Sequence, residues 1–279
     1  MPEASDSDFI RQPVSVGIVA QLGRGILDIL QILGECTSLM IATVWHCRSF
    51  LRHRDKVLAQ LILIGSETLG IASLVSLFVG MVMVVQAADQ LMNYTQEILG
   101  SLVGLAMTKE LGPVVMGFLV AGKSGSAIAA EIGSMKVYDE ISALKTMDID
   151  PIPFLSMPRF IAVTLAIPML IVYSDVIGIL GGAFVVAVDP GIQISVSQYF
   201  DNLTQWLNFN DVVVGFIKGM VFGMLVSVIA CAFGFRTTGG SEGVAKSTTS
   251  AVVWSFVMII ISDYVLVRIA FLFLPTGGR

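Results

Sequence analysis

Long hydrophobic runs alternate with short polar segments along most of this chain. Five of the runs are long enough for a helix to cross a hydrocarbon core of about 30 Å, with some tilt. They are residues about 61–87, 100–128, 158–188, 209–235 and 247–274. Runs of this length are typical of transmembrane helices. The pattern therefore predicts an all-α polytopic membrane protein with five transmembrane helices.

The first 56 residues follow a different pattern. Residues 1–14 are polar, lack the hydrophobic segment of a cleaved signal peptide, and predict a disordered tail. Residues 15–56 alternate apolar clusters with charges such as Asp28 and Glu35, which favours an amphipathic helix lying in the membrane interface. One helical crossing within residues 26–47 stays open as the alternative. The remaining residues, 57–279, form the predicted transmembrane domain.

The basic residues predict the orientation of the helices. Nine of the sixteen Lys and Arg residues lie in three polar segments, 48–56, 129–159 and 236–246. The segments 88–99 and 189–211 contain acidic residues and neither Lys nor Arg. The positive-inside rule then places the first three segments in the cytoplasm. The N-terminus is expected in the cytoplasm and the C-terminus on the outer side.

Composition supports the membrane assignment and excludes other classes. Only 13% of the residues are charged, against about 25% in ordinary soluble domains. The net charge is −5 and no basic tract is present, so we expect no nucleic-acid partner. Cys36, Cys47 and Cys231 are scattered, and His46 and His53 have no ligand-like spacing around them. We expect neither a metal ion nor a cofactor.

One motif suggests nucleotide binding, and its context argues against it. Residues 117–124, GFLVAGKS, fit the phosphate-loop pattern G-x-x-x-x-G-K-S. A phosphate loop needs a turn after a strand, with free backbone amides pointing at the phosphates. Here the pattern lies within a hydrophobic run, where backbone amides must bond inside the helix. We interpret Gly122 and Gly125 as close-packing residues and Lys123 as reaching the cytoplasmic interface.

Ionisable residues at membrane depth are costly and therefore indicate candidate functional positions. Lys109 and Glu110 fall in the outer half of the second run, and Lys218 in the outer half of the fourth. They could line a polar cavity whose two cations suit an anionic lipid headgroup; the alternative is an internal ion pair that fixes helix register. Asp263 is the candidate for a buried structural acid. Glu67 and Asp175 also fall within hydrophobic runs.

Small residues predict close helix contacts. Gly215, Gly219 and Gly223 recur every four residues and form one face of the fourth helix. Such faces allow close helix approach inside a membrane. Packing within the chain is the simpler interpretation, and a subunit interface is the alternative.

A polar helix is expected at residues 131–147, directly after the second hydrophobic run. Val137, Ile141 and Leu144 form one apolar stripe, and charged residues occupy the other faces. A helix of this kind either rests on the membrane, connects two spans, or docks into the groove of a soluble partner. The candidate partner-binding residues are Glu131, Lys136, Asp139, Glu140, Ile141 and Leu144.

Several segments resemble the MlaE/YrbE family of ABC transporter permeases. They include ELGP at 110–113, AGKSGSA at 121–127, AEIGSM at 130–135 and GSEGVAKSTT at 240–249. The resemblance covers residues 50–274. Lys109 and Lys123 stand where the family commonly has Arg, which keeps the charge and weakens bidentate recognition.

The resemblance implies a permease homodimer with two cytoplasmic ATPase subunits, an outer MCE-domain lipid-binding protein, and in some systems a STAS-domain regulator. The substrate implied is a phospholipid or a similar hydrophobic molecule, moved between a bacterial inner membrane and a periplasmic carrier to maintain outer-membrane lipid asymmetry. Residues 131–147 then correspond to the coupling helix, and Lys109, Glu110 and Lys218 to positions near the lipid cavity. ATP hydrolysis is expected on another subunit, so the chain itself is not an enzyme.

Two other classes remain open from the sequence alone. The intramembrane carboxylates favour an ion-coupled secondary transporter, although no inverted repeat or pair of broken helices is evident. A noncatalytic membrane scaffold for an outer complex is the other alternative.

Overall fold

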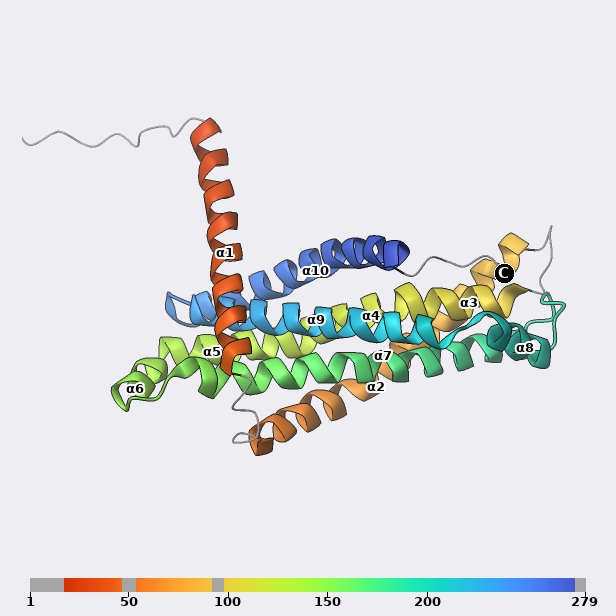
Figure 1. Ribbon diagram of the computed structural model, residues 1–279, viewed down its shortest axis with the longest axis horizontal. Helices are drawn as coiled ribbons and strands as arrows, with labels where there is room; N and C mark the ends of the chain where they lie inside the picture. The colour runs from red at the N-terminus through yellow and green to blue at the C-terminus, as the bar shows by residue number, and fades with distance from the viewer. Residues whose placement is uncertain (1–17, 47–53, 92–97, 274–279) are drawn as a thin grey trace, which may run out of the picture.

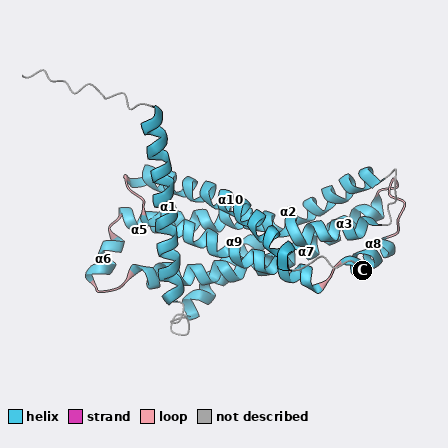
Figure 2. Cartoon of the chain, turned by 45° about the horizontal axis from the view of Figure 1, so that its top comes forward, coloured by secondary structure: helices cyan, strands magenta, loops and turns pink. Residues whose placement is uncertain are grey.

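The computed structural model describes residues 18–46, 54–91 and 98–273, and the regular elements in these ranges are all helices (Figure 2). The predicted disordered tail at 1–14, Cys47 and His53 lie outside the described residues. The labels η3, η4 and η5 denote short π-helical turns next to α-helices. The elements are α1 Ile18–His46, α2 Arg54–Leu91, α3 Leu99–Ala106, η3 Met107–Leu111, α4 Gly112–Val120, η4 Ala121–Gly125, α5 Ser126–Val137, α6 Glu140–Thr146, η5 Ile152–Ser156, α7 Met157–Val188, α8 Val196–Trp206, α9 Phe209–Phe235 and α10 Gly240–Phe273.

Five helical segments have the length and composition to cross a membrane, which confirms the predicted fold class. They are α2, the α3–α5 run at Leu99–Val137, the η5–α7 run at Ile152–Val188, α9, and Gly240–Leu272 of α10. Their most hydrophobic windows have mean hydropathies between 1.4 and 2.3. Helix α9 has the predicted bounds, and the other four segments begin before the predicted runs, in α2 and α10 because polar residues continue those helices at their N-terminal ends.

Helix α1 runs across the bundle rather than along it (Figure 1). It contacts α9, α7 and η5 near one end of the molecule. The side chain of Glu35 on α1 forms an ion pair with Arg236, which follows α9, at 3.3 Å. This transverse course favours the interfacial interpretation of residues 15–56 over a sixth crossing at residues 26–47.

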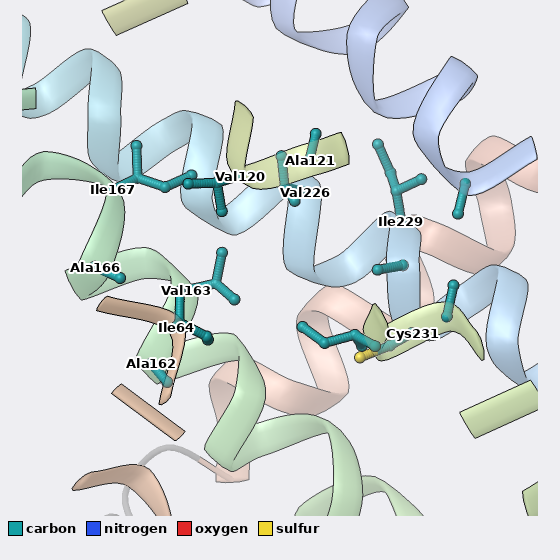
Figure 3. Close-up of a cluster of buried hydrophobic side chains, with 14 of the residues drawn as sticks. Ile64, Val120, Ala121, Ala162, Val163, Ala166, Ile167, Val226, Ile229 and Cys231 are labelled. Carbon is teal, nitrogen blue, oxygen red and sulfur yellow. The ribbon is translucent and has the colours of Figure 1, made fainter. Parts of the chain in front are cut away.

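Helix α7 occupies the centre of the bundle, with α2 on one side and α9 on the other. A Cβ atom on Gly80 of α2 would lie 1.9 Å from the carbonyl oxygen of Gly178, so only glycine allows this contact. Side chains from α2, α4, α7 and α9 fill the core between them, including Ile64, Val120 and Val226 (Figure 3).

The glycines of α9 pack within the chain. A Cβ atom on Gly223 would lie 2.6 Å from the Cα atom of Thr164 in α7, and one on Gly219 would lie 3.0 Å from the Cα atom of Pro168. A Cβ atom on Gly215 would lie 2.7 Å from the carbonyl oxygen of Thr108. The face predicted from their spacing therefore holds α9 against α7 and η3, in line with the simpler interpretation.

The glycines in the phosphate-loop pattern divide into two cases. A Cβ atom on Gly125 would lie 3.2 Å from a methyl group of Val226, so Gly125 packs closely against α9. Nothing lies within 4 Å of the corresponding point on Gly122. The prediction that Gly122 is a close-packing residue is wrong within this chain, because its α-carbon faces away from the bundle.

The prediction of a single polar helix at residues 131–147 is also wrong, because the segment forms parts of two helices. Helix α5 ends at Val137, and Asp139 adopts the left-handed conformation with φ of 59°. Helix α6 then begins at Glu140 in a new direction, with the Ala143 amide donating to the Asp139 carbonyl at 2.9 Å. Aspartate tolerates this conformation better than most residues. Its turn closes a helical hairpin at one end of the molecule (Figure 1).

Helix α8, at the opposite end, was not predicted (Figure 1). Ser195 and Gln198 form a capping box at its start, a signal that the sequence contains as S-x-x-Q. Tyr199 and Leu203 are buried against α3, where Gly100 and Gly104 leave room for them. The segment 189–211 is therefore a packed cap rather than an open loop.

Candidate functional site

Five charged side chains from three elements meet inside the bundle. They are Lys109, Glu110, Asp211, Lys218 and Asp263, and we call them the intramembrane charge cluster. Lys218 lies at its centre with only 2% of its side chain exposed. Its ammonium lies 2.9 Å from Glu110 Oε2 and 2.9 Å from Asp263 Oδ1. The contact with Glu110 is a hydrogen bond, and that with Asp263 is an ion pair by distance.

A third oxygen comes from the backbone. Lys218 Nζ donates to the carbonyl of Lys109 at 2.7 Å. In an α-helix this carbonyl would accept the amide of residue 113, but Pro113 has no N–H to donate. The helix is locally wound as the π-turn η3, in which the Gly112 amide bonds to the Met107 carbonyl. The sequence Lys109-Glu-Leu-Gly-Pro113 thus presents both a carboxylate and a carbonyl to Lys218.

The second lysine of the cluster has its own acid. Lys109 Nζ lies 2.8 Å from Asp211 Oδ1, and Asp211 Oδ2 also accepts the amide of Asn208 at 3.1 Å. This acid is in the first turn of α9, so the ion pair joins η3 to the start of that helix. Lys109 and Glu110 are the more accessible members, with side chains 37% and 47% exposed.

The geometry changes the expected electrostatics of the site. Two lysines and three carboxylates give the cluster a formal charge of −1 when all are ionised, so it is not the free cationic pair that the sequence suggested. The Lys218 ammonium donates hydrogen bonds to the Lys109 carbonyl and to Glu110, and it lies at ion-pair distance from Asp263, whose Oδ1 atom has no hydrogen-bond partner among the described residues. Lys218 therefore organises its neighbours here, while Lys109 and Glu110 present the accessible charges. Asp263 is 18% exposed beside Lys218, and its structural role stays a prediction.

The other two intramembrane acids lie elsewhere. Glu67 of α2 is 3.6 Å from Lys123, which also donates to its backbone carbonyl. Asp175 of α7 is buried, and its Oδ1 atom has no hydrogen-bond partner among the described residues. A Cβ atom on Gly112 would lie 2.1 Å from that oxygen, so Gly112 is what lets the carboxylate approach η3.

The candidate partner-binding residues separate into exposed and buried groups. Asp139 and Glu140 are exposed in the α5–α6 turn, and Lys136 is half-buried beside it. Ile141 is only 3% exposed and belongs to the main core, against which Leu144 also packs. The apolar stripe therefore anchors α6 to its own chain and leaves the polar turn for contact with other molecules.

Glu131 has a specific partner that the sequence did not suggest. Its Oε1 atom lies 2.7 Å from a guanidinium nitrogen of Arg159, which is buried at the start of α7. Arg159 also donates to the Leu155 carbonyl at 3.3 Å. This pair connects the middle of α5 to the start of α7.

Asp211 and Arg159 are thus the charged residues that sequence reasoning missed. Asp211 lies in the polar segment 189–211, and the spacing Asn208-x-x-Asp211 just before a hydrophobic run is a helix-start signal that could have found it. Arg159 follows Pro158 at the start of a span, and nothing in the local pattern distinguishes it from an interfacial arginine.

The phosphate-loop pattern forms no loop. Residues 117–124 lie in α4 and η4, within one uninterrupted helical run. The Ala121 amide, for example, bonds to the carbonyls of Gly117 and Phe118. Amides engaged in this way are not available to a phosphate, as predicted.

The fold and the cluster define a polytopic helical membrane protein with paired charges at membrane depth, an arrangement typical of transport proteins. The sequence matches the family model described as Permease MlaE over residues 57–269. The chain belongs to the MlaE permease family, which confirms the resemblance found from its motifs.

Three relatives illustrate the range of similar proteins. The intermembrane phospholipid transport system permease protein MlaE of Haemophilus influenzae is 34% identical over 92% of this chain and 98% of that protein. A probable ABC transporter permease protein of Rickettsia bellii is 33% identical over 92% and 98%. The chloroplastic protein TRIGALACTOSYLDIACYLGLYCEROL 1 of Arabidopsis thaliana is 39% identical over 94% and 69%.

Proposed function

We propose that this chain is the membrane permease subunit of an ATP-driven ABC transporter that moves phospholipids, or similar hydrophobic molecules, between the bacterial inner membrane and a periplasmic MCE-domain carrier. The observation that carries the proposal is family membership over residues 57–269. The name of the Haemophilus influenzae relative, which aligns over nearly its whole length, supports the substrate class. Such transport would maintain lipid asymmetry in the outer membrane.

The intramembrane charge cluster is the proposed headgroup contact. Lys109 and Glu110 carry its accessible charges, and a zwitterionic headgroup offers both a phosphate for the ammonium and an amine for the carboxylate. Lys218 holds Glu110 and the backbone of η3 in position from behind. A phosphate that draws Lys109 away from Asp211 would loosen the link between η3 and α9, so headgroup binding and helix movement would be coupled.

The α5–α6 turn is the proposed ATPase contact. Tyr138, Asp139 and Glu140 are all exposed there. The Glu131–Arg159 pair and buried Ile141 fix the turn to α7 and to the core. Force applied to the turn would therefore reach the central helix of the bundle. ATP hydrolysis takes place on two separate copies of the soluble subunit in this scheme.

The proposed assembly is a permease homodimer, and α10 is its candidate interface. The apolar side chains of Val253, Ile260, Ile261 and Tyr264 are exposed on one face of this helix. The small-residue face of α9, by contrast, is already used within the chain. The MCE-domain protein would bind on the outer side, and a STAS-domain regulator could join on the cytoplasmic side.

Orientation follows from the distribution of basic residues. The N-terminus and the α5–α6 turn would face the cytoplasm, and α8 and the C-terminus the periplasm. The positions of α6 and α8 at opposite ends of the bundle (Figure 1) are consistent with this orientation.

Reconstitution into lipid vesicles tests the function against its two alternatives. Transfer of labelled phospholipid that requires both the partner ATPase and ATP supports the proposal. Transfer driven by a proton or ion gradient alone would instead support a secondary transporter, which the buried carboxylate of Asp175 would suit. Intact assembly without any lipid transfer would support a scaffold.

The coupling role has a separate test. Glu140→Lys reverses an exposed charge in the turn and should reduce co-purification of the ATPase without unfolding the permease. Lys246→Glu, a charge reversal of an exposed residue on α10, provides the control. Normal ATPase binding and transport in Glu140→Lys would remove the turn from the interface.

A further inference from the structure

A second apolar site lies between α1, α9 and α10, away from the charge cluster. It is a cavity of about 180 Å³. Its wall includes Ile32, Cys36 and Met40 of α1, Val228 and Phe233 of α9, and Trp254 of α10. Leu225, the wall residue of α9 nearest to Lys218 along the helix, is seven residues from it, which corresponds to about 10 Å at 1.5 Å per residue. The cavity and the cluster are therefore different sites.

The cavity exists because α1 crosses the bundle instead of packing along it (Figure 1). A helix that lies across two others contacts them over a short length, and a wedge stays open beside the crossing. The ion pair between Glu35 and Arg236 fixes α1 at this point, next to Cys36 and one turn beyond Phe233. Leu33 and Met40 line the cavity while remaining about a third exposed, at 37% and 36%, so the cavity has an open side.

The cavity wall has almost no free hydrogen-bonding groups for water. Thr37 is the polar wall residue, and its hydroxyl already donates to the Leu33 carbonyl at 2.7 Å. An apolar cavity of about 150 Å³ in a protein core stays dry and binds small hydrocarbons. This cavity is of similar size and adjoins helices that cross a membrane, where the available hydrocarbon is a lipid acyl chain.

We infer that this cavity holds one acyl chain of a phospholipid from the leaflet that borders α1, with its headgroup near Arg236. Phe233 is two residues from the end of α9 and Leu225 ten, so the wall spans roughly the first 15 Å below the helix end. Arg236 is 35% exposed at this end, and its guanidinium, which pairs with Glu35 through one nitrogen, has further N–H groups that can donate to a phosphate. Helix α1 would then bind a lipid at a site separate from the headgroup contact proposed above, and this binding would not require an ATPase.

Trp254 provides a direct reporter of the occupant. In a Trp45→Phe/Trp206→Phe background it is the remaining tryptophan of the full chain. Nanodiscs of phosphatidylethanolamine with brominated acyl chains should quench its fluorescence at least twofold relative to nanodiscs of the same lipid without bromine. Adding Cys36→Phe or Met40→Phe fills the cavity from α1 and should reduce that quenching by half or more.

The matched control is Leu27→Phe, the same kind of change on the exposed side of α1. Brominated lipid should quench Trp254 fluorescence in this variant to the same extent as in the tryptophan-depleted background. All variants should keep the same helical circular dichroism and elution volume. Equal quenching in Leu27→Phe and in both cavity variants would overturn the inference, because the bromine would then act from the surrounding bilayer. Absence of quenching, as expected if a second copy of the chain filled the cavity, would also overturn it.

Discussion

Lys218 donates a hydrogen bond to the backbone carbonyl of Lys109, 109 positions earlier in the chain, at 2.7 Å. The carbonyl is available because Pro113 cannot donate to it, and the ammonium is buried because three oxygens surround it. Pro113 leaves the Lys109 carbonyl without its usual α-helical donor, and Lys218 donates to that carbonyl, which in turn helps to compensate for burial of the ammonium. The result fixes η3, on which the accessible charges of Lys109 and Glu110 are mounted.

Removal of the central ammonium should destabilise the chain. Lys218→Met leaves Asp263 and Glu110 without their cation, and we expect a loss of about 3 kcal/mol, the low end for a broken buried pair because Glu110 is partly exposed. Lys123→Met, which breaks a more exposed pair with Glu67, should cost about 1 kcal/mol or less. Equilibrium unfolding in mixed micelles measures both. Equal losses would contradict the central role of Lys218.

The ion pair with Asp263 should be visible as coupling. In Lys218→Met/Asp263→Asn the orphaned carboxylate is also neutral, so the double variant should lose less stability than the sum of the two single variants. A coupling energy of about 0.5–3 kcal/mol is typical for residues in one ion-pair network. The same unfolding assay completes the cycle, and strict additivity would mean that the 2.9 Å contact contributes nothing.

Glycine substitutions should separate packed from unpacked helix faces. Gly223→Ala places a methyl group 2.6 Å from the Cα atom of Thr164, so α9 must move away from α7, and we expect a loss of about 1–3 kcal/mol. Gly122→Ala meets nothing within 4 Å and should leave stability unchanged or slightly raised. Thermal melting of the detergent-solubilised variants tests the contrast. A Gly122→Ala loss as large as that of Gly223→Ala would refute it.

The turn at Asp139 should depend on backbone conformation rather than on charge. Asp139→Gly keeps the left-handed conformation accessible, whereas Asp139→Val raises its energy by about 1–2 kcal/mol. The valine variant should expose α6 and increase the rate of trypsin cleavage after Lys145 severalfold. Comparable cleavage rates in the two variants would show that the turn tolerates a β-branched residue.

Cysteine labelling tests the proposed orientation. In a background without Cys36, Cys47 and Cys231, Trp206→Cys at the end of α8 should react with a membrane-impermeant maleimide in intact spheroplasts. Tyr138→Cys in the α5–α6 turn should react only after permeabilisation. Both side chains are exposed in the native chain, at 54% and 74%. The opposite pattern of labelling would invert the topology.

Hydrophobic periodicity and length determined much of this protein from its sequence alone. The five spans and the rejection of the phosphate loop follow from the solvent, because a bilayer requires long apolar helices with internally bonded amides. The interfacial position of α1 stays a prediction. The α9 glycine face follows from spacing in the same way. Placing a charged residue within a membrane span costs free energy whichever partner it has. Lys109, Glu110 and Lys218 could therefore be recognised as candidates before their partners were known.

Only the tertiary structure decided what these residues do for one another. The partners Asp211 and Asp263 come from other helices, and their distances depend on rotations that no local pattern encodes. The break at Asp139 lies in a single backbone angle, which aspartate permits but does not require. The burial of Ile141 and the cavity beneath α1 depend in the same way on how whole helices cross. Sequence specifies the membrane-crossing helices, and packing between distant helices decides which charges are paired and which surfaces remain free.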